Sequence, residues 1–292
     1  MPDRARDHLG QFGVWRPVSM LTPGLALALE EAGYGTLWVG GSPDGSLAEI
    51  EALIDATTTL TLATGIVNIW KDTAADVAAS FRRIEARHPG RFLLGIGAGH
   101  REATQEYTRP YEALVSYVDA LLDQGVPRDD LVLAALGPKV LRLSAERTAG
   151  AHPYLVTPEH TRRARAIMGD GPVLAPEQKV VLDTDPARAR AIGRPRVQRP
   201  YLGMFNYTSN LRRLGWSDDD LRDGGSDALI DALVAHGSAP QVAARLHEHL
   251  DAGDRSSQRV LDHAAQSREI RERATRVICQ TDLSEKQDRK RD

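Results

Sequence analysis

Short apolar stretches alternate with amphipathic segments along most of the chain. The apolar stretches cover residues 9–15, 36–41, 60–68, 91–99, 130–137, 149–156 and 172–183, and a segment with helical spacing of apolar side chains follows each one. Near-continuous apolar strands that alternate with helices are typical of a parallel sheet covered by helices. Seven such units before residue 195, with one more expected later, predict an α/β fold, a (β/α)8 TIM barrel.

The alternation changes towards the C-terminus. Residues 195–221 are rich in aromatic and asparagine residues and predict an insertion before the last unit, after which helices are expected at 226–237 and 238–253. Residues 254–292 are densely charged, with six Val, Leu or Ile residues and no aromatic ones. A buried strand needs an apolar run of about 4–8 residues. We therefore expect a barrel domain over 1–253, a divergent charged tail over 254–292, and a short, degenerate or absent eighth strand.

Composition limits the classes of function. The chain has 292 residues, 41% of them hydrophobic, a net charge of -3 and a pI near 6.3, so it offers no electrostatic reason to bind nucleic acid. Its single cysteine, Cys279, excludes an intramolecular disulfide framework. The N-terminal residues contain no apolar signal-peptide core, and no run approaches the roughly 18 apolar residues of a membrane span. We expect a cytoplasmic protein without membrane partners.

The apolar run at 91–99 ends in three glycines, Gly95, Gly97 and Gly99, and His100 follows. A Rossmann fingerprint is G-x-G-x-x-G and opens directly into a helix. Here the order is G-x-G-x-G, late in the chain, so that interpretation fits poorly. The segment instead predicts the loop after barrel strand four, on the face where active sites of this fold lie. The alternative is that the glycines only fit a crowded strand end.

Gly137, Pro138 and Lys139 stand where strand five ends and a helix begins. The free amides and the positive end of that helix, together with the lysine charge, can bind an anion. An ordinary turn with a proline in the first helical position explains the same residues equally well.

Histidines offer further candidate chemistry. His152 lies just outside predicted strand six, and a structural histidine is as good an explanation there as a catalytic one. His247 and His249 are two positions apart, unlike the i, i+4 pair of a zinc motif, and predict a solvated helix face. The sequence indicates no metal site and no G-x-S-x-G elbow of a hydrolase.

Five segments together resemble the luciferase-like family of flavin and deazaflavin oxidoreductases, with most similarity to its actinobacterial branch predicted to use coenzyme F420. They read "TLWVGG", "ATGIVNIW", "HPGRFLLGIGAGH", "ALGPKVLRLSAERTAGAHPYLVTPEHT" and "LAPEQKVVLD". The similarity runs in order from about residue 9 to about residue 253. The family fold is a (β/α)8 barrel with an insertion before the last unit, which agrees with the pattern above.

The resemblance implies roles for matching positions. A bulge with a cis non-prolyl peptide, which backs the flavin ring, would fall within Gly65, Ile66, Val67 and Asn68. Gly97, Ala98, Gly99 and His100 would line the ring and substrate side, and Gly137, Pro138 and Lys139 would hold the cofactor phosphate. Many F420-dependent relatives have an acidic or histidine residue after strand two, where this chain has "VGGSPDG". This departure leaves His100 and His152 as candidate proton donors.

The leading hypothesis is hydride transfer between the deazaflavin C5 and a small organic substrate, with F420 as cofactor and Trp15, Trp70 and Tyr154 as apolar walls. An FMN-dependent luciferase-like monooxygenase is the alternative within the family. A non-catalytic barrel that binds deazaflavin or another ligand is the alternative from a different class, because a fold does not fix a function. A homodimer is expected.

Overall fold

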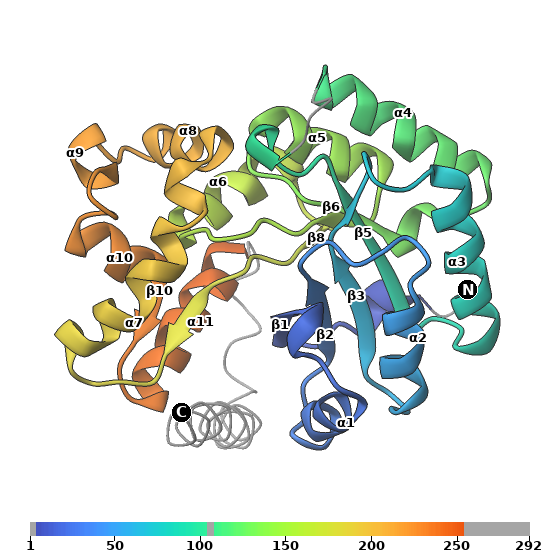
Figure 1. Cartoon of the computed structure of the whole chain (residues 1–292), viewed down its shortest axis with the longest axis horizontal. Coiled ribbons are helices and arrows are strands. Elements are labelled where there is room, and N and C mark those ends of the chain that lie inside the picture. The colour runs from blue at the N-terminus through green and yellow to red at the C-terminus, as the bar shows by residue number, and fades with distance from the viewer. Residues whose placement is uncertain (1–3, 104–107, 254–292) are drawn as a thin grey trace. The chain divides into compact units, whose positions relative to one another are not determined.

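A computed structural model describes residues 4–103 and 108–253 of the chain (Figure 1). Within these limits the chain forms two compact units. The first unit comprises the residues up to Tyr154 together with 163–177 and 204–206. The second unit comprises 155–162, 178–203 and the residues from Tyr207 onwards.

The first unit is built on a parallel sheet that curls (Figure 1). Its strands follow the order β1-β2-β3-β5-β6-β7-β8, with β4 paired to β5, so strands that are consecutive in sequence are also neighbours in space. The strands are β1 (Gly13–Pro17), β2 (Thr36–Gly40), β3 (Thr61–Gly65), β4 (Val67–Asn68), β5 (Phe92–Gly97), β6 (Leu131–Leu133), β7 (Gly150–Ala151) and β8 (Val173–Leu174). The predicted parallel α/β architecture is confirmed for this part of the chain.

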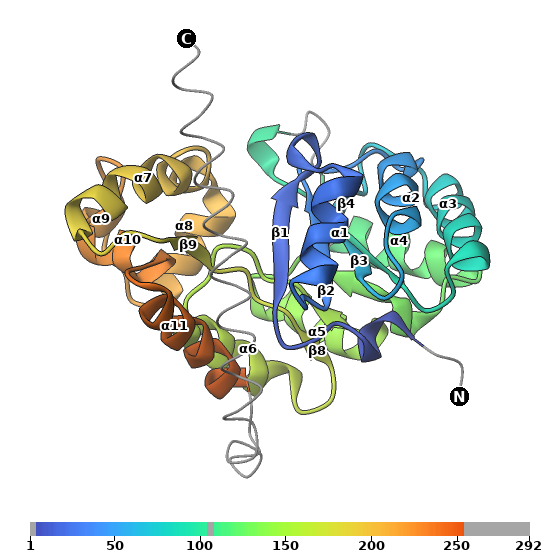
Figure 2. The same cartoon turned by 90° about the horizontal axis from the view of Figure 1, so that it is seen from below.

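Helices connect these strands and cover one face of the sheet (Figure 2). Local signals in the sequence start two of them: the Thr22 hydroxyl accepts the Leu25 N–H at the start of α1, and the Thr73 hydroxyl accepts the Asp76 N–H at the start of α3. The helices are α1 (Pro23–Glu31), α2 (Ala48–Asp55), α3 (Ala74–Arg87), α4 (Pro110–Asp123), α5 (Pro138–Arg147) and α6 (Pro158–Met168).

A layer of side chains from neighbouring strands fills the concave side of the sheet. The pairing register places Trp38 beside Ala63, and Ala63 beside Leu93. All three side chains are buried, and the layer continues through Val132. Ala5, from a short 3-10 helix near the N-terminus, is fully buried against the same layer. The interior is therefore a packed core and not a pore.

One residue is inserted between β3 and β4. Ala63 pairs with Leu93, and the next pairing on this side joins Val67 to Ile96. Val67 lies four positions after Ala63, whereas Ile96 lies three positions after Leu93 on β5. The extra residue between β3 and β4 defines a β-bulge.

The Thr64 hydroxyl occupies the interrupted part of this ladder. It accepts a hydrogen bond from the Gly95 N–H and donates one to the Gly95 carbonyl, each at 2.8 Å. Thr64 is fully buried, so these two backbone groups have no access to water. The side chain thereby replaces the backbone partners that the bulge removes.

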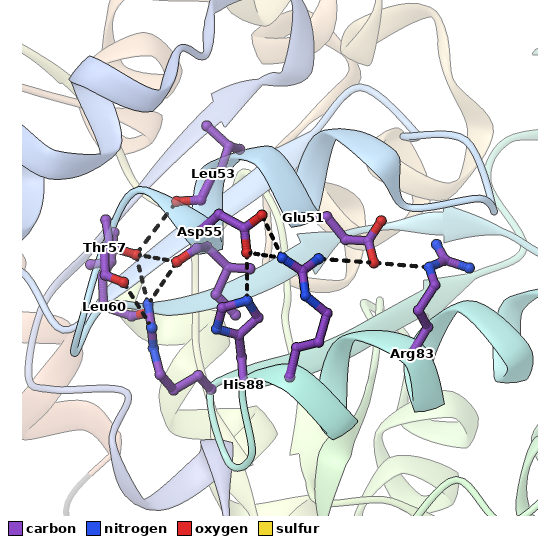
Figure 3. Close-up of polar contacts among 10 residues, drawn as sticks. Glu51, Leu53, Asp55, Thr57, Leu60, Arg83 and His88 are labelled. Atoms are coloured by element: carbon purple, nitrogen blue, oxygen red, sulfur yellow. Dashed lines mark hydrogen bonds and ion pairs between the residues drawn. The ribbon is translucent and has the colours of Figure 1, made fainter.

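A polar network ties α2 to α3 and to the turn that precedes β3 (Figure 3). The Arg91 guanidinium donates to the carbonyls of Thr57 at 2.9 Å and Leu60 at 3.0 Å, and to the Thr57 hydroxyl at 2.6 Å. Asp55 accepts hydrogen bonds from Arg87 and contacts His88. These contacts lie where the chain enters β3, at the opposite end of that strand from its glycine, and we assign them to stability.

The second unit contains a separate two-stranded parallel sheet. Strand β9 (Lys179–Val181) pairs with β10 (Val234–His236), and α7, α10 and α11 pack against it. The helices of this part of the chain are α7 (Pro186–Gln198), α8 (Phe205–Arg213), α9 (Asp218–Leu221), α10 (Asp227–Leu233) and α11 (Ala239–Gly253). The segment predicted as an insertion is therefore largely helical.

Two predictions for this region are wrong. The single strand expected at 172–183 consists of β8 and β9, which belong to different sheets. The Glu177 N–H still donates to the Pro153 carbonyl of the first unit, and two residues later Lys179 begins the pairing with β10. The helix expected at 226–237 ends at Leu233, and β10 begins at the next residue. Val234 is β-branched and buried, and its backbone is extended, which suits it to the ladder with β9.

Closure of the barrel stays a prediction. Among the described residues β1 pairs with β2 alone. The expectation that the eighth strand is short, degenerate or absent and the charged tail expected over 254–292 both concern residues outside those described. No helix in the described part of the chain has the length and apolar character needed to cross a membrane.

We expect Thr64→Val to lower the free energy of unfolding by about 1–3 kcal/mol, because valine keeps the shape but leaves both Gly95 backbone groups buried without partners. Urea denaturation measures this change. Thr64→Ser is the matched control, since it keeps the hydroxyl. Equal denaturation midpoints for wild type and Thr64→Val would show that the hydroxyl does not support the bulge.

Candidate functional site

The carboxyl ends of β4 and β5 bring together two groups of residues singled out from the sequence. Asn68 pairs with Gly97, and the Trp70 indole N–H donates to the Ala98 carbonyl at 2.8 Å. Gly99 has a φ of +61°, and a Cβ there would lie 2.8 Å from Asn68 Nδ2. The segments Gly65–Ile66–Val67–Asn68 and Gly97–Ala98–Gly99 are therefore adjacent, and the Gly65–Ile66 peptide bond is cis.

Packing within the protein accounts for several of these glycines. A Cβ at Gly95 would lie 1.9 Å from the Thr64 carbonyl oxygen, and one at Gly97 would lie 3.0 Å from the Ala134 Cβ. The alternative of a crowded strand end thus explains why these positions are glycine. Their relevance to function rests on where they lie, at the edge of the sheet at which βα loops form active sites.

The N-terminus of α5 follows β6, the strand next to β5 in the sheet. Gly137 is the N-cap residue, and no described side chain caps the helix there. Pro138 occupies the first turn and the exposed Lys139 follows, its Nζ 6.0 Å from the centroid of the Tyr111 ring. Uncapped amides beside a lysine can bind an anion, and an anion site here stays a prediction beside the alternative of an ordinary turn.

His152 lies just beyond β7 and is buried, with 4% of its surface exposed. Its ring stacks on Trp38 with a centroid separation of 4.1 Å and an interplanar angle of 17°. Nδ1 lies 2.6 Å from the Ala175 carbonyl oxygen, which can only accept, so Nδ1 carries the proton. Burial lowers the pKa of His152 to about 4, although the bond to Ala175 opposes the shift. At neutral pH the ring is therefore neutral and poorly suited to donate a proton.

His100 is in a different environment. It is half-buried, directly after Gly99, and its side chain forms a hydrogen bond with that of Asn206. Desolvation lowers the pKa of His100, while the bond to Asn206 and the charge of Glu102 oppose the shift. Glu102 also accepts the Phe205 N–H at 3.0 Å, so the loop after β5 is tied to residues 204–206 within the first unit.

Two aromatic side chains cover the ends of the first strands. The Trp15 indole lies over Gly40, where a Cβ would approach it to 1.9 Å, and over Gly65, where a Cβ would lie 2.8 Å from Nε1. Tyr154 packs against Trp15 with ring centroids 4.9 Å apart. Trp15 and Tyr154 therefore pack on each other, whereas the Trp70 indole N–H bonds the Ala98 carbonyl. That the three side chains form an apolar wall stays a prediction.

One histidine was misjudged from the sequence. His249 does not lie on a solvated face, because only 6% of it is exposed, and it contacts Thr161 Oγ1 at 2.8 Å and Gln178 Oε1 at 3.0 Å. The signal was present: His249 follows the buried Val242 by seven positions and so lies on the same side of α11. Among the described residues no group of three or more His, Cys, Asp or Glu side chains is arranged to hold a metal ion.

The described residues define a parallel βα protein, with the candidate site at the carboxyl ends of its strands, where active sites of βα barrels lie. Residues 22–123 match the model of the luciferase-like monooxygenase family. This segment contains β2 to β5 and hence both glycine-containing groups and His100. No curated protein matches the chain.

Solved structures share the fold at low sequence identity. An F420-dependent secondary alcohol dehydrogenase in complex with an F420–acetone adduct is 15% identical with a TM-score of 0.64, over 82% of this chain and 90% of its own. The coenzyme F420-dependent tetrahydromethanopterin reductase from Methanopyrus kandleri is 14% identical with a TM-score of 0.61, over 83% and 90%. The oxygenating constituent of 3,6-diketocamphane monooxygenase from Pseudomonas putida, in complex with FMN, is 16% identical with a TM-score of 0.53, over 79% and 83%. The chain thus shares the fold of these F420- and FMN-dependent enzymes, and residues 22–123 match the luciferase-like family model.

The depressed pKa of His152 predicts a loss of stability in acid. Between pH 6.5 and about 4 the unfolded chain binds a proton at His152 that the folded chain does not, so stability falls as the pH falls, by roughly 3 kcal/mol in total. His152→Phe should reduce the slope of this part of the curve of unfolding free energy against pH, measured by urea denaturation, and the remaining slope comes from His249, whose pKa burial also lowers to about 4. His88→Phe is the control, since His88 lies in the network of Figure 3. Parallel curves for wild type and His152→Phe would contradict the assignment.

Proposed function

We propose that this protein is an oxidoreductase that uses coenzyme F420 to move a hydride to or from a small organic substrate. One observation supports the proposal most strongly: the N-terminus of α5 lies one strand away from the glycine-containing loops of β4 and β5. The N-terminus of α5 would bind the phosphate of a flavin or deazaflavin cofactor. The glycine-containing loops after β4 and β5 would lie against its ring. The family match over 22–123 supports the same assignment.

The residues present fit such a group. Gly137, Pro138 and Lys139 would hold its phosphate, through uncapped amides and a lysine ammonium. Gly65–Asn68 and Gly97–Gly99 would back the ring, since these two segments lie side by side at the carboxyl ends of β4 and β5. When bound, the deazaflavin supplies the C5 position that exchanges hydride with the substrate. The protein supplies orientation, a dry surface and a group that handles the proton.

His100 is the better of the two candidate histidines for that proton. It is half-buried and follows the glycine loop directly, whereas His152 is fully enclosed and binds the Ala175 carbonyl through Nδ1. Because desolvation lowers the pKa of His100, its imidazole is neutral at neutral pH and can accept the proton that a substrate loses on oxidation. The protonated ring returns that proton in the reverse direction.

The wider architecture follows from the same assignment. We infer that residues 1–253 form one barrel domain and that the protein acts as a homodimer. The match to 90% of the length of each F420-dependent neighbour supports a shared fold. Light scattering of the full chain measures the oligomeric state.

Two alternative functions are each favoured by a specific observation. An FMN-dependent monooxygenase is favoured by the FMN-bound neighbour and by the family model. A non-catalytic ligand-binding barrel is favoured by the segment after β2, "GSPDG", which lacks the acidic or histidine residue of many relatives directly after the strand. Titration with F420 and with FMN, followed by a hydride-transfer assay, separates the three. Tight binding of FMN alone would overturn the F420 proposal, and binding of F420 without turnover would favour the non-catalytic function.

Lys139→Ala should weaken F420 binding roughly tenfold to a hundredfold, the contribution of a charge-assisted contact to phosphate. Lys179→Ala is the matched control, because Lys179 also lies over a tyrosine ring but belongs to the second unit. Affinity is measured by titration and folding by thermal denaturation. Unchanged affinity for Lys139→Ala would place the phosphate elsewhere.

His100→Ala should lower kcat about 100-fold or more with little change in F420 affinity, since general base catalysis contributes at least that much. For substrate oxidation, kcat of the wild type should rise with pH through a pKa below 6.5, and the variant should lose this dependence. His88→Ala is the control, at the opposite end of the sheet. A variant that keeps the wild-type pH profile would exclude His100 as the base.

A further inference from the structure

Residues 204–206 are bound to the loop that carries His100. They belong to the first unit, whereas the residues on either side of them in sequence belong to the second. The Glu102 carboxylate accepts the Phe205 N–H at 3.0 Å, and Met204 is buried, with 9% of its surface exposed. The bond to Phe205 lowers the pKa of Glu102, so the acceptor is a charged carboxylate at neutral pH. Asn206 is thereby held next to His100.

The side chain of Asn206 forms a hydrogen bond with the side chain of His100. The Oδ1 atom of Asn206 is buried and has no hydrogen-bond partner among the described residues. The amide therefore contacts the ring through Nδ2, which can only donate. Buried acceptors are rarely left without a partner, so Oδ1 calls for a physical explanation.

The two ends of the amide suit the two protonation states of the ring. A neutral imidazole presents a lone pair on one nitrogen, which accepts from the Nδ2–H, whereas a protonated imidazole has an N–H on both nitrogens and needs an acceptor. A half-turn about the Cβ–Cγ bond exchanges Nδ2 and Oδ1, and the energy profile of this torsion is broad and roughly two-fold. Because Oδ1 has no other partner, the half-turn breaks no hydrogen bond of that atom.

We propose that Asn206 is a positioning residue for His100: its amide stays hydrogen-bonded to the ring while the ring gains and loses a proton, donating through Nδ2 to the neutral ring and accepting through Oδ1 from the protonated ring. The catalytic part of this inference rests on the proposed function. A hydrogen bond from a charged N–H is roughly twice as strong as a neutral one, so the pair favours the protonated ring. The effect of Asn206 on the pKa of His100 has the same direction, upward.

The charge of Glu102 acts on the same ring. Desolvation is the largest effect on the pKa of His100 and lowers it, whereas the carboxylate of Glu102 raises it through its charge. Arg101, the next residue, interacts with Glu102 in turn. Glu102 and Asn206 thus shift the His100 equilibrium in the same direction, and a test has to separate the charge from the hydrogen bond.

The test follows proton binding at His100 by NMR in the cofactor-free, full-length protein, with asparagine and histidine labelled with nitrogen-15. The chain has three asparagines, Asn68, Asn206 and Asn210, and therefore three side-chain amide nitrogen signals. The Asn206 amide signal should move with the same midpoint as the His100 ring, and His100→Gln should abolish that movement. Asn210 is the internal control, because its Oδ1 already accepts from Arg213.

Two substitutions should move the His100 midpoint in opposite directions. Asn206→Asp keeps the shape and fixes a charged acceptor beside the ring, so the midpoint should rise by about one pH unit or more. Asn206→Leu keeps the size and removes both polar ends, so the midpoint should fall by about half a pH unit to one pH unit. Phe205→Leu is the matched control: it changes the exposed neighbouring side chain, keeps the backbone bond to Glu102 and should leave the midpoint unchanged.

Glu102→Gln separates the charge from the contact. Glutamine keeps an acceptor for the Phe205 N–H but carries no charge, so the midpoint of His100 should fall. An Asn206 amide signal that still follows the lower midpoint supports a direct contact. A signal that no longer follows it reports only the charge of Glu102 and overturns the inference.

The pH profile of kcat for substrate oxidation tests the catalytic part. Its rise should move with the His100 midpoint in Asn206→Asp, while the affinity for F420 stays the same. A midpoint that responds in the cofactor-free protein, beside a kcat profile that does not, would support the contact and show that His100 is not the base. The failure of the proposed function is thereby distinguished from the failure of this inference.

An Asn206 amide signal that stays constant through the His100 titration overturns the inference, as does an unchanged midpoint in Asn206→Leu. If Asn206→Leu does not fold, Asn206→Asp decides, because aspartate has the shape of asparagine and an unchanged midpoint there has the same meaning.

Discussion

The hydroxyl of Thr64 is the contact on which the candidate site depends. It binds both the N–H and the carbonyl of Gly95 where the inserted residue breaks the ladder between β3 and β5. Side chains in a strand alternate between faces, so one inserted residue reverses which side the following residues occupy. Beyond the bulge Val67 is buried, and Asn68 accepts the Trp70 N–H and lies against Gly99. The arrangement of residues at the carboxyl ends of β4 and β5 therefore depends on the buried Thr64 at the end of β3.

Much of the first unit could be predicted from the sequence, because each apolar run is bounded by residues that stop a strand or start a helix. Thr22 and Thr73, which cap α1 and α3, are examples of such local signals. The second unit was harder. Val234 continues the apolar pattern of α10, but its backbone is extended and it pairs with Lys179 of β9, 55 residues earlier in the chain. Local patterns do not encode a partner at that distance.

The candidate site shows a similar division. The order of strands and helices in the sequence predicts which residues lie at strand ends. It correctly predicts that the glycine-containing loop after β5 and helix α5 after β6 follow neighbouring strands. The roles of the histidines could not be read in this way, because His100 and His152 differ in burial and not in local sequence. What separates them is the stack on Trp38 and the Ala175 carbonyl, both supplied by other strands. Protonation state is thus a tertiary property of this chain.

The two sheets also differ in how they can assemble during synthesis. In the first unit each strand pairs with a neighbour close in sequence, so ladders can form as the chain emerges. Strand β9 has no such neighbour: its partner β10 arrives only after α7 to α10 have been made, and pairing must close a loop whose entropic cost grows with its length. Until then the edge of β9 is open, and this interval is when a chaperone or a second nascent chain could pair with it.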